Sequence, residues 1–167
     1  MIHSISEFET LWIRESAATQ KILDRLTDSS LDCPVAPGNR TLGRLAWHIV
    51  TTIPEMMSRT GLEFKGVQHT DPVPRRAEDI SRAYRQVAGT ILDQIRDKWT
   101  DSSLVVEDEM YGERWKRSES LTGLIFHEIH HRGQMTVLMR QAGLKVPGVY
   151  GPALEEWAEY GMQPPSV

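Results

Sequence analysis

Two histidines, His127 and His131, stand four residues apart in a segment rich in apolar residues. In a helix, residues at this spacing lie one turn apart on the same face, so both imidazoles point in the same direction. Each neutral imidazole offers a nitrogen lone pair, and two of them on a rigid helix can bind one divalent metal ion. The pair therefore predicts half of a metal site.

The best candidate for a third ligand is His48, which lies far upstream in another segment with helical apolar spacing. A lone histidine is more often hydrogen-bonded or exposed than a metal ligand. His48 is a candidate ligand because the distant pair could bind the same ion. Three imidazoles from two helices leave a coordination position open, which distinguishes reactive metal sites from closed structural ones. We therefore predict a site for one divalent ion at His48, His127 and His131, for which zinc, nickel, cobalt and iron are all suitable.

Other residue types offer alternative chemistries. His127, Glu128 and His131 fit the His-Glu-x-x-His pattern of zinc proteases. A small helical chain has no sheet to align a peptide, which argues against a protease. Metal-assisted hydrolysis with Glu55 or Glu128 as the base is a further hypothesis. Cys33 lacks a visible cationic or helix-start context that would activate its thiol, so we interpret it as inert or exposed.

We expect the residues next to the pair, and the remaining histidines, to support the site or to face solvent. His130 points about 100° away from its neighbour on a helix, so we expect it beside the site or on the surface. Arg132 is expected to pair with a carboxylate, and Gly133 to allow the close approach of another helix. His3 and His69 lie in polar contexts, where we expect solvated side chains.

Four stretches have the apolar spacing of amphipathic helices. Their expected ranges are about 6–26, 41–61, 77–99 and 118–143. Ser6 with Glu9 fits a capping box for the first helix. Thr41 can cap the second helix and Gly61 can close it, whereas Pro54 should bend it.

The segments between the helices differ in character. Residues 62–76 are polar and contain glycine and prolines, which predicts a long connection. Residues 100–117 lose helical periodicity and predict an extended crossing or a weak hairpin. A Pro/Gly-rich turn at 146–152 precedes an expected short helix at 153–160. The sequence therefore predicts an all-α fold: an antiparallel four-helix bundle with a long connection between helices 2 and 3 and a short C-terminal helix, in one domain spanning 1–167.

Composition excludes several function classes. The net charge of -4 argues against nucleic acid as an obligatory partner, because such proteins usually present a basic face. The single cysteine cannot form an intramolecular disulfide. The first residues lack the features of a secretory signal, and no apolar run approaches the roughly 20 residues that span a bilayer. We therefore expect a cytoplasmic protein without a membrane partner.

The run His127-Glu128-Ile129-His130-His131-Arg132-Gly133-Gln134, together with His48 in a Leu-x-x-Leu-x-x-His pattern, resembles the DinB family of bacterial damage-inducible proteins. The resemblance covers nearly the whole chain. It implies a four-helix bundle whose second and third helices are joined by a long connection. It also implies a three-histidine metal site, carried onto His48, His127 and His131, and a homodimer.

Some members of the wider DinB/YfiT-like superfamily are similar to thiol S-transferases or isomerases that use bacillithiol, mycothiol or glutathione at the metal. The resemblance therefore implies a metal-dependent thiol S-transferase acting in stress or detoxification, with a low-molecular-weight thiol as partner. A non-catalytic, metal-binding dimeric stress protein and a metal-assisted hydrolase are the alternatives. An open cavity over the histidines would favour an enzyme, and a site sealed by aromatic side chains a structural role.

Overall fold

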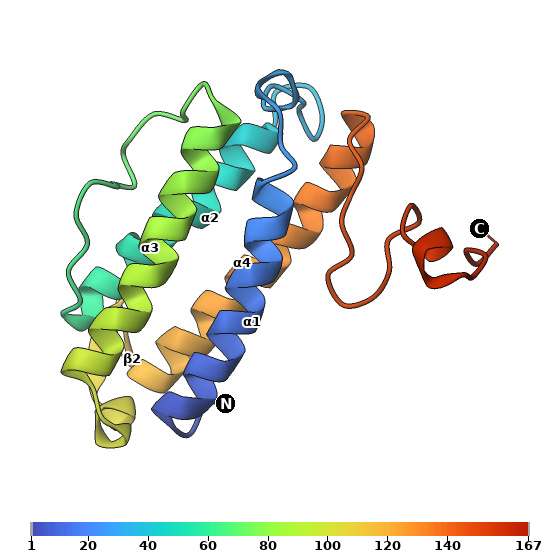
Figure 1. The fold of residues 1–167 in the computed structure, drawn as a ribbon. Helices are drawn as coiled ribbons and strands as arrows, with labels where there is room; N and C mark the ends of the chain where they lie inside the picture. The colour runs from blue at the N-terminus through green and yellow to red at the C-terminus, as the bar shows by residue number, and fades with distance from the viewer. Residues whose placement is uncertain (1, 167) are drawn as a thin grey trace.

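A computed structural model describes residues 2–166, which form long α-helices at the four expected positions (Figure 1). Within these residues the α-helices are α1 (Ile5–Leu23), α2 (Leu42–Met57), α3 (Ala77–Lys98) and α4 (Arg117–Gln141). The same part of the chain contains the short 3-10 turns η1 (Asp28–Ser30), η2 (Ser58–Thr60), η3 (Asp101–Val105) and η4 (Trp157–Tyr160) and the strands β1 (Glu107–Met110) and β2 (Glu113–Lys116). The predicted all-α fold class is confirmed.

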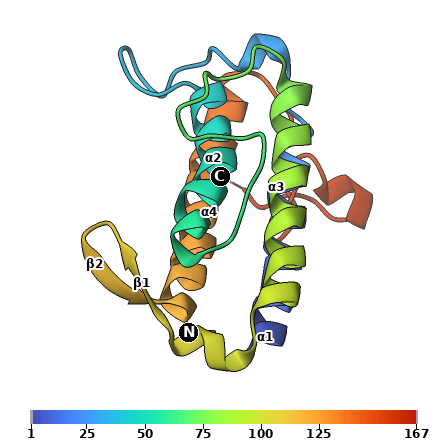
Figure 2. The same cartoon turned by 90° about the vertical axis from the view of Figure 1, so that its left-hand side faces the viewer.

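The helices do not alternate in direction along the chain as an antiparallel bundle requires. After α2, residues 61–76 return along the length of the bundle, and α3 then runs in the same direction as α2 (Figures 1 and 2). The predicted antiparallel order is therefore wrong for this pair, whereas the long connection is confirmed. Extended chain covers roughly 3.3 Å per residue and helix about 1.5 Å, so the connection is long enough to run back past α2.

The ends of the first two helices follow local capping chemistry, with one correction. α1 begins after Ser4 rather than Ser6, because the Ser4 hydroxyl accepts a hydrogen bond from the N–H of Glu7 at 3.1 Å. Ser4 and Glu7 have the same Ser-x-x-Glu spacing as the predicted box two residues later, so the pattern alone cannot choose between them. Thr41 caps α2 as predicted, and Gly61 follows η2 with a φ of 84°.

The segment between α3 and α4 contains a hairpin, which was one of the two predicted forms. β1 and β2 pair antiparallel and lie at the end of the bundle where α4 begins (Figure 2). Tyr111 and Gly112 form the connecting turn with φ values of 55° and 88°, the sign that a tight two-residue hairpin turn requires.

The C-terminal segment contains less helix than predicted for residues 153–160, where only the 3-10 turn η4 forms. The N–H groups of Gly148 and Ala153 both donate to the Glu156 carboxylate, at 3.0 and 2.9 Å. These bonds close a loop where the helix would have to begin. The predicted helix is therefore wrong in length.

The core lies between the four helices and is built from their apolar faces. Trp12 and Tyr84 are almost fully buried, and the indole N–H of Trp12 donates to the Ala88 carbonyl at 3.0 Å. The indole N–H of Trp47 donates to the Asp71 carbonyl at 3.0 Å, which ties the long connection to α2. No helix in the described part of the chain combines the length and the apolar character needed to cross a membrane.

Candidate metal centre

The structure brings the three predicted histidines together. His48 extends from α2 toward His127 and His131 on α4, and the candidate ligand nitrogens of all three lie within 4.8 Å of one another. The Nε2 atoms of His48 and His127 are 3.0 Å apart. Two helices that are remote in sequence and antiparallel in space therefore form one cluster, which is compatible with metal binding.

A chain of hydrogen bonds fixes the orientation of the His131 ring. Its Nδ1 lies 2.7 Å from Oε1 of Gln134, and because an amide oxygen only accepts, Nδ1 carries the proton. The Gln134 amide nitrogen lies 3.2 Å from Nε2 of His130, so it donates to that exposed ring. This arrangement leaves the Nε2 lone pair of His131 available to a metal ion. His130 supports the site through Gln134, in agreement with its predicted place beside the pair.

The surroundings of the three rings keep them neutral at neutral pH. Burial, together with the charges of His131, Arg40 and Arg44, lowers the pKa of His48 to about 4. Burial and the neighbouring His131 and His48 lower the pKa of His127 to about 4. Burial also lowers the pKa of His131. Neutral imidazole is the form that binds a metal ion, so no ring must first lose a proton.

The geometry of the donor atoms fits one divalent ion. Two nitrogens bound tetrahedrally at about 2.0–2.1 Å lie about 3.3 Å apart. The Nε2 atoms of His48 and His127 are already 3.0 Å apart, so only a small opening of the pair is needed. Three nitrogen donors suit zinc, nickel, cobalt or iron and leave a position for a further ligand.

A pocket opens beside the cluster. It has a volume of about 440 Å³, and His131 forms part of its wall. The other lining residues come from the loop before α2, from α2 itself and from the C-terminal half of α4, and no aromatic side chain other than His131 lines it within the described residues. The volume falls within the range of small-molecule sites. Of the three clustered histidines only His131 lines it, so the pocket lies beside the cluster rather than over all three rings.

The two carboxylates considered as bases are engaged away from the histidines. Glu55 accepts a hydrogen bond from the Tyr111 hydroxyl at 2.5 Å. Glu128 is 1% exposed, and its Oε1 accepts hydrogen bonds from Thr19 and Tyr84, both at 2.7 Å, on the side of α4 that faces α1 and α3. Within residues 2–166 neither carboxylate has a histidine as hydrogen-bond partner. Their placement does not support either residue as the base of a hydrolase.

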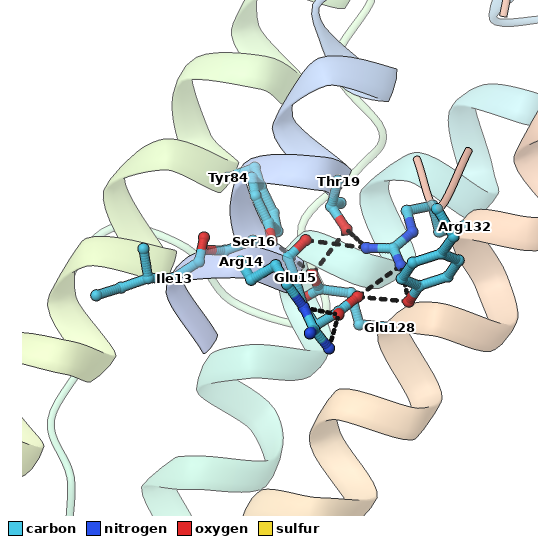
Figure 3. Close-up of polar contacts among 9 residues, drawn as sticks. Ile13, Arg14, Glu15, Ser16, Thr19, Tyr84, Glu128 and Arg132 are labelled. Carbon is cyan, nitrogen blue, oxygen red and sulfur yellow. Dashed lines mark hydrogen bonds and ion pairs between the residues drawn. The ribbon is translucent and has the colours of Figure 1, made fainter. Parts of the chain in front are cut away.

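Behind the histidines, a buried polar network joins α4 to α1, as Figure 3 shows for Arg132, Glu15 and Thr19. The Arg132 guanidinium donates to the Glu15 carboxylate at 2.7 Å and to the Thr19 hydroxyl at 3.1 Å. The Tyr150 hydroxyl donates to the same carboxylate at 2.5 Å. The predicted pairing of Arg132 with a carboxylate is confirmed. Because His131 directly precedes Arg132, this network helps to fix the rotation of α4 that turns the histidines toward α2.

Sequence reasoning missed the partners of Arg132. Glu15 and Thr19 lie on the buried face of α1, between Trp12 and Ile22. A polar side chain on an apolar helix face needs a buried partner, so this placement was an available signal. Tyr150 gave no comparable signal, because it belongs to an irregular segment whose course cannot be read from periodicity.

The surroundings of four other residues test the predictions made for them. Gly133 is exposed, and a Cβ there would meet no atom within 4 Å, so the predicted close approach of another helix is wrong. His3 and His69 are exposed, as predicted. Cys33 is half-buried, with its Sγ 3.8 Å from the Leu138 carbonyl oxygen.

Comparison with known proteins agrees with the fold. Residues 1–165 match the model of the DinB family. The uncharacterized protein YrdA of Bacillus subtilis (strain 168) is 43% identical over 167 residues, covering 100% of both chains. The crystal structure of a DinB-like protein from Bacillus cereus ATCC 10987 is similar with a TM-score of 0.87 and 49% identity, over 90% of this chain and 100% of that chain.

A second solved structure, the DinB-like protein YjoA from Bacillus subtilis, has a TM-score of 0.68 over 88% of this chain and 99% of that chain. At 15% identity this similarity concerns the fold alone. The match to the family model covers nearly the whole sequence, and the helical bundle with its three clustered histidines is consistent with it. This chain belongs to the DinB family.

Proposed function

We propose that this protein binds one divalent metal ion through His48, His127 and His131 and uses it to activate a low-molecular-weight thiol for transfer to an electrophile. The observation that carries the proposal is the cluster of three neutral imidazoles, of which one, His131, also lines a pocket of about 440 Å³. A structural metal site would instead be closed by a fourth protein ligand.

The ion, when bound, supplies a Lewis acid that lowers the pKa of a thiol at its open position. The chain's residues hold and orient this centre: His48 and His127 form one side, and the Gln134 amide keeps Nε2 of His131 directed toward it. The thiol loses its S–H proton to solvent, and its sulfur forms a bond to an electrophilic carbon. The leaving group departs with the electron pair of the bond that breaks. Removal of reactive electrophiles is a role in stress response or detoxification.

The positions of the carboxylates favour a thiol over water as the nucleophile. Water attack commonly relies on a protein base within hydrogen-bond reach. Glu55 is bound to Arg59 and Tyr111, and Glu128 faces α1 and α3. A free thiol has a pKa of about 8.5, so it needs much less assistance than water to lose its proton.

The experiment is a conjugation assay with a chromogenic electrophile and bacillithiol, mycothiol or glutathione. The protein is tested metal-free and loaded with zinc, nickel, cobalt or iron. We expect at least one pair of thiol and metal to react faster than with metal-free protein. His48→Ala should abolish this gain, and His69→Ala, which removes an exposed histidine of the long connection, should keep it. If no combination exceeds the metal-free rate, the transferase proposal is wrong.

A homodimer is part of the proposal. Phe126 is 66% exposed on α4, beside a hollow that Ile2, Leu11 and Ile125 also line. Aromatic side chains are enriched at protein interfaces. Light scattering should give twice the chain mass at micromolar concentration for the wild type and the single-chain mass for Phe126→Glu. A monomeric wild type would contradict this assembly.

A further inference from the structure

The pocket beside His131 has an apolar wall with unused contact surface. The wall is formed by Val35, Leu45, Val137 and Leu138. Leu45 and Leu138 belong to the buried core, whereas Val35 and Val137 are 50% and 59% exposed. Branched aliphatic side chains left half-exposed in a cavity can still gain free energy by covering an apolar ligand. The wall therefore favours a ligand with an apolar body.

The rim of the same pocket is cationic. Arg40 lines it together with the neutral side chains of Asn39, Gln134 and Gln141, and no acidic residue lines the pocket in the described part of the chain. The protein as a whole has a net charge of -4, whereas the charged side chain that lines this pocket is positive. A cationic rim without acids selects an anion.

Arg40 is free to bind such an anion. Its guanidinium makes no hydrogen bond or ion pair with any group in residues 2–166, whereas Arg117 and Arg140 each pair with a carboxylate. The backbone beneath it is ordered by hydrogen bonds. The Arg40 carbonyl accepts from the Val35 N–H at 3.0 Å, and the residues on either side of this pair form a β-bridge. The loop therefore presents an unpaired cation from a defined backbone.

We propose that this pocket binds a small organic carboxylate, with the carboxylate paired to Arg40 and the apolar body against Val35 and Val137. A guanidinium can hold a carboxylate through two parallel N–H bonds, which fixes direction as well as position. The bound molecule then lies beside His131, the one histidine of the cluster that lines the pocket. The role of this molecule as a substrate rests on the proposed function, but the binding itself requires no metal.

The test uses phenylbutyrate, which joins a carboxylate to an aromatic ring through a short chain, and its neutral analogue phenylbutyramide. Calorimetry and NMR titration of the full-length, metal-free protein measure the two dissociation constants, with probe up to millimolar concentration. We expect saturable binding of the acid and about tenfold weaker binding of the amide, because the amide cannot form the charged pair with Arg40.

Three variants separate the charge from the wall. Arg40→Gln should weaken the binding of phenylbutyrate about tenfold and leave that of phenylbutyramide unchanged. Arg44→Gln is the matched control, because Arg44 is also exposed but does not line the pocket. It should bind both probes like the wild type. Val137→Asn should weaken both probes, since each places its ring against the wall. Circular dichroism checks that each variant is folded.

The proposal would be overturned by any of three results: equal affinity for phenylbutyrate and phenylbutyramide, wild-type affinity of Arg40→Gln for phenylbutyrate, or no saturable binding of phenylbutyrate. These outcomes are distinguishable from failure of the proposed function, because they are measured without metal, thiol or electrophile. If conjugation fails while binding still depends on Arg40, the transferase is wrong and the carboxylate site remains. If conjugation succeeds while Arg40→Gln binds normally, only the carboxylate site is wrong.

Discussion

The Nε2 atoms of His48 and His127 lie 3.0 Å apart, although 79 residues separate the two histidines in the sequence. In the metal-free protein this contact is favourable when the N–H of one ring donates a hydrogen bond to the unprotonated nitrogen of the other. Protonation of both rings would place two positive charges side by side. The contact therefore ties the stability of the bundle to the charge on its histidines.

Metal-free protein should lose stability as the pH falls from about 6.5 to about 4, the ordinary and the folded-state pKa of His48 and His127. Between these two pH values the unfolded chain binds more protons than the folded one, so the free energy of unfolding rises with pH. The contribution of the two histidines to stability is fully present above pH 6.5, their ordinary pKa. Urea unfolding across this range measures the effect. His48→Ala should flatten the profile and His69→Ala should preserve it. Identical profiles for the wild type and His48→Ala would contradict the prediction.

Zinc should stabilise the wild type against unfolding. A ligand that binds only the folded state at a hundredfold excess over Kd adds about 2.7 kcal/mol. His131→Ala removes one of the three donors and should lose most of this gain, whereas His69→Ala should retain it. Thermal melts with zinc and with a chelator measure the difference. A wild-type melting temperature that does not respond to either would count against the metal site.

Arg132→Met should destabilise the protein by about 3–5 kcal/mol, because the Glu15 side chain is 1% exposed and would lose its buried cationic partner. Arg140→Met is the control: its pair with Glu155 lies at the surface, with side chains 43% and 27% exposed, and should contribute no more than about 1 kcal/mol. Chemical denaturation gives both values. Comparable losses would show that the buried pair contributes no more than the surface pair.

Glu128→Gln should gain stability relative to the wild type as the pH rises above 4.5, the ordinary pKa of the carboxyl. Burial raises the pKa of Glu128 in the folded protein, so its favourable contribution is present at low pH and is lost as the pH rises through the folded-state value. Glutamine stays neutral, and its carbonyl oxygen can still accept from Thr19 and Tyr84. Unfolding free energies of the two proteins at acidic and mildly alkaline pH test this. A constant difference between them would rule it out.

Gly133→Ala should stabilise α4 by about 1 kcal/mol, because a Cβ there meets no atom within 4 Å and alanine is the better helix former. Gly112→Ala should do the opposite, since Gly112 has a φ of 88° in the hairpin turn. Thermal unfolding of both variants provides the comparison. A destabilised Gly133→Ala would mean that the glycine is needed for a contact outside the single chain.

The three histidines could be predicted because their positions follow from local rules. The spacing of His127 and His131 fixes a common helix face, and His48 recurs in a second helix of the same bundle. Helix ranges likewise follow from apolar periodicity and from caps such as Thr41. The parallel course of α2 and α3 could not be predicted this way, because periodicity identifies the buried face of a helix but not the direction in which it runs.

The parts that escaped prediction depend on contacts between distant or irregular segments. Arg40 reaches the pocket because backbone hydrogen bonds fold its loop back over the start of α2. Glu15 finds Arg132 only after α1 docks against α4. Glu156 closes the C-terminal loop by binding N–H groups that come before it in the chain. None of these partners is encoded by spacing within one element.

The arrangement of the helices makes the two halves of the chain complementary fragments. α1 and α2 each pack extensively against α3 and α4. A cut within residues 61–76 would therefore yield two helix pairs whose apolar faces lie bare until the pieces meet. When the two fragments are mixed, they should reassemble into the bundle. His48 of the N-terminal fragment would then lie beside His127 and His131 of the C-terminal fragment. Two intact chains could exchange halves through the same connection, and each three-histidine cluster would then be built from two molecules.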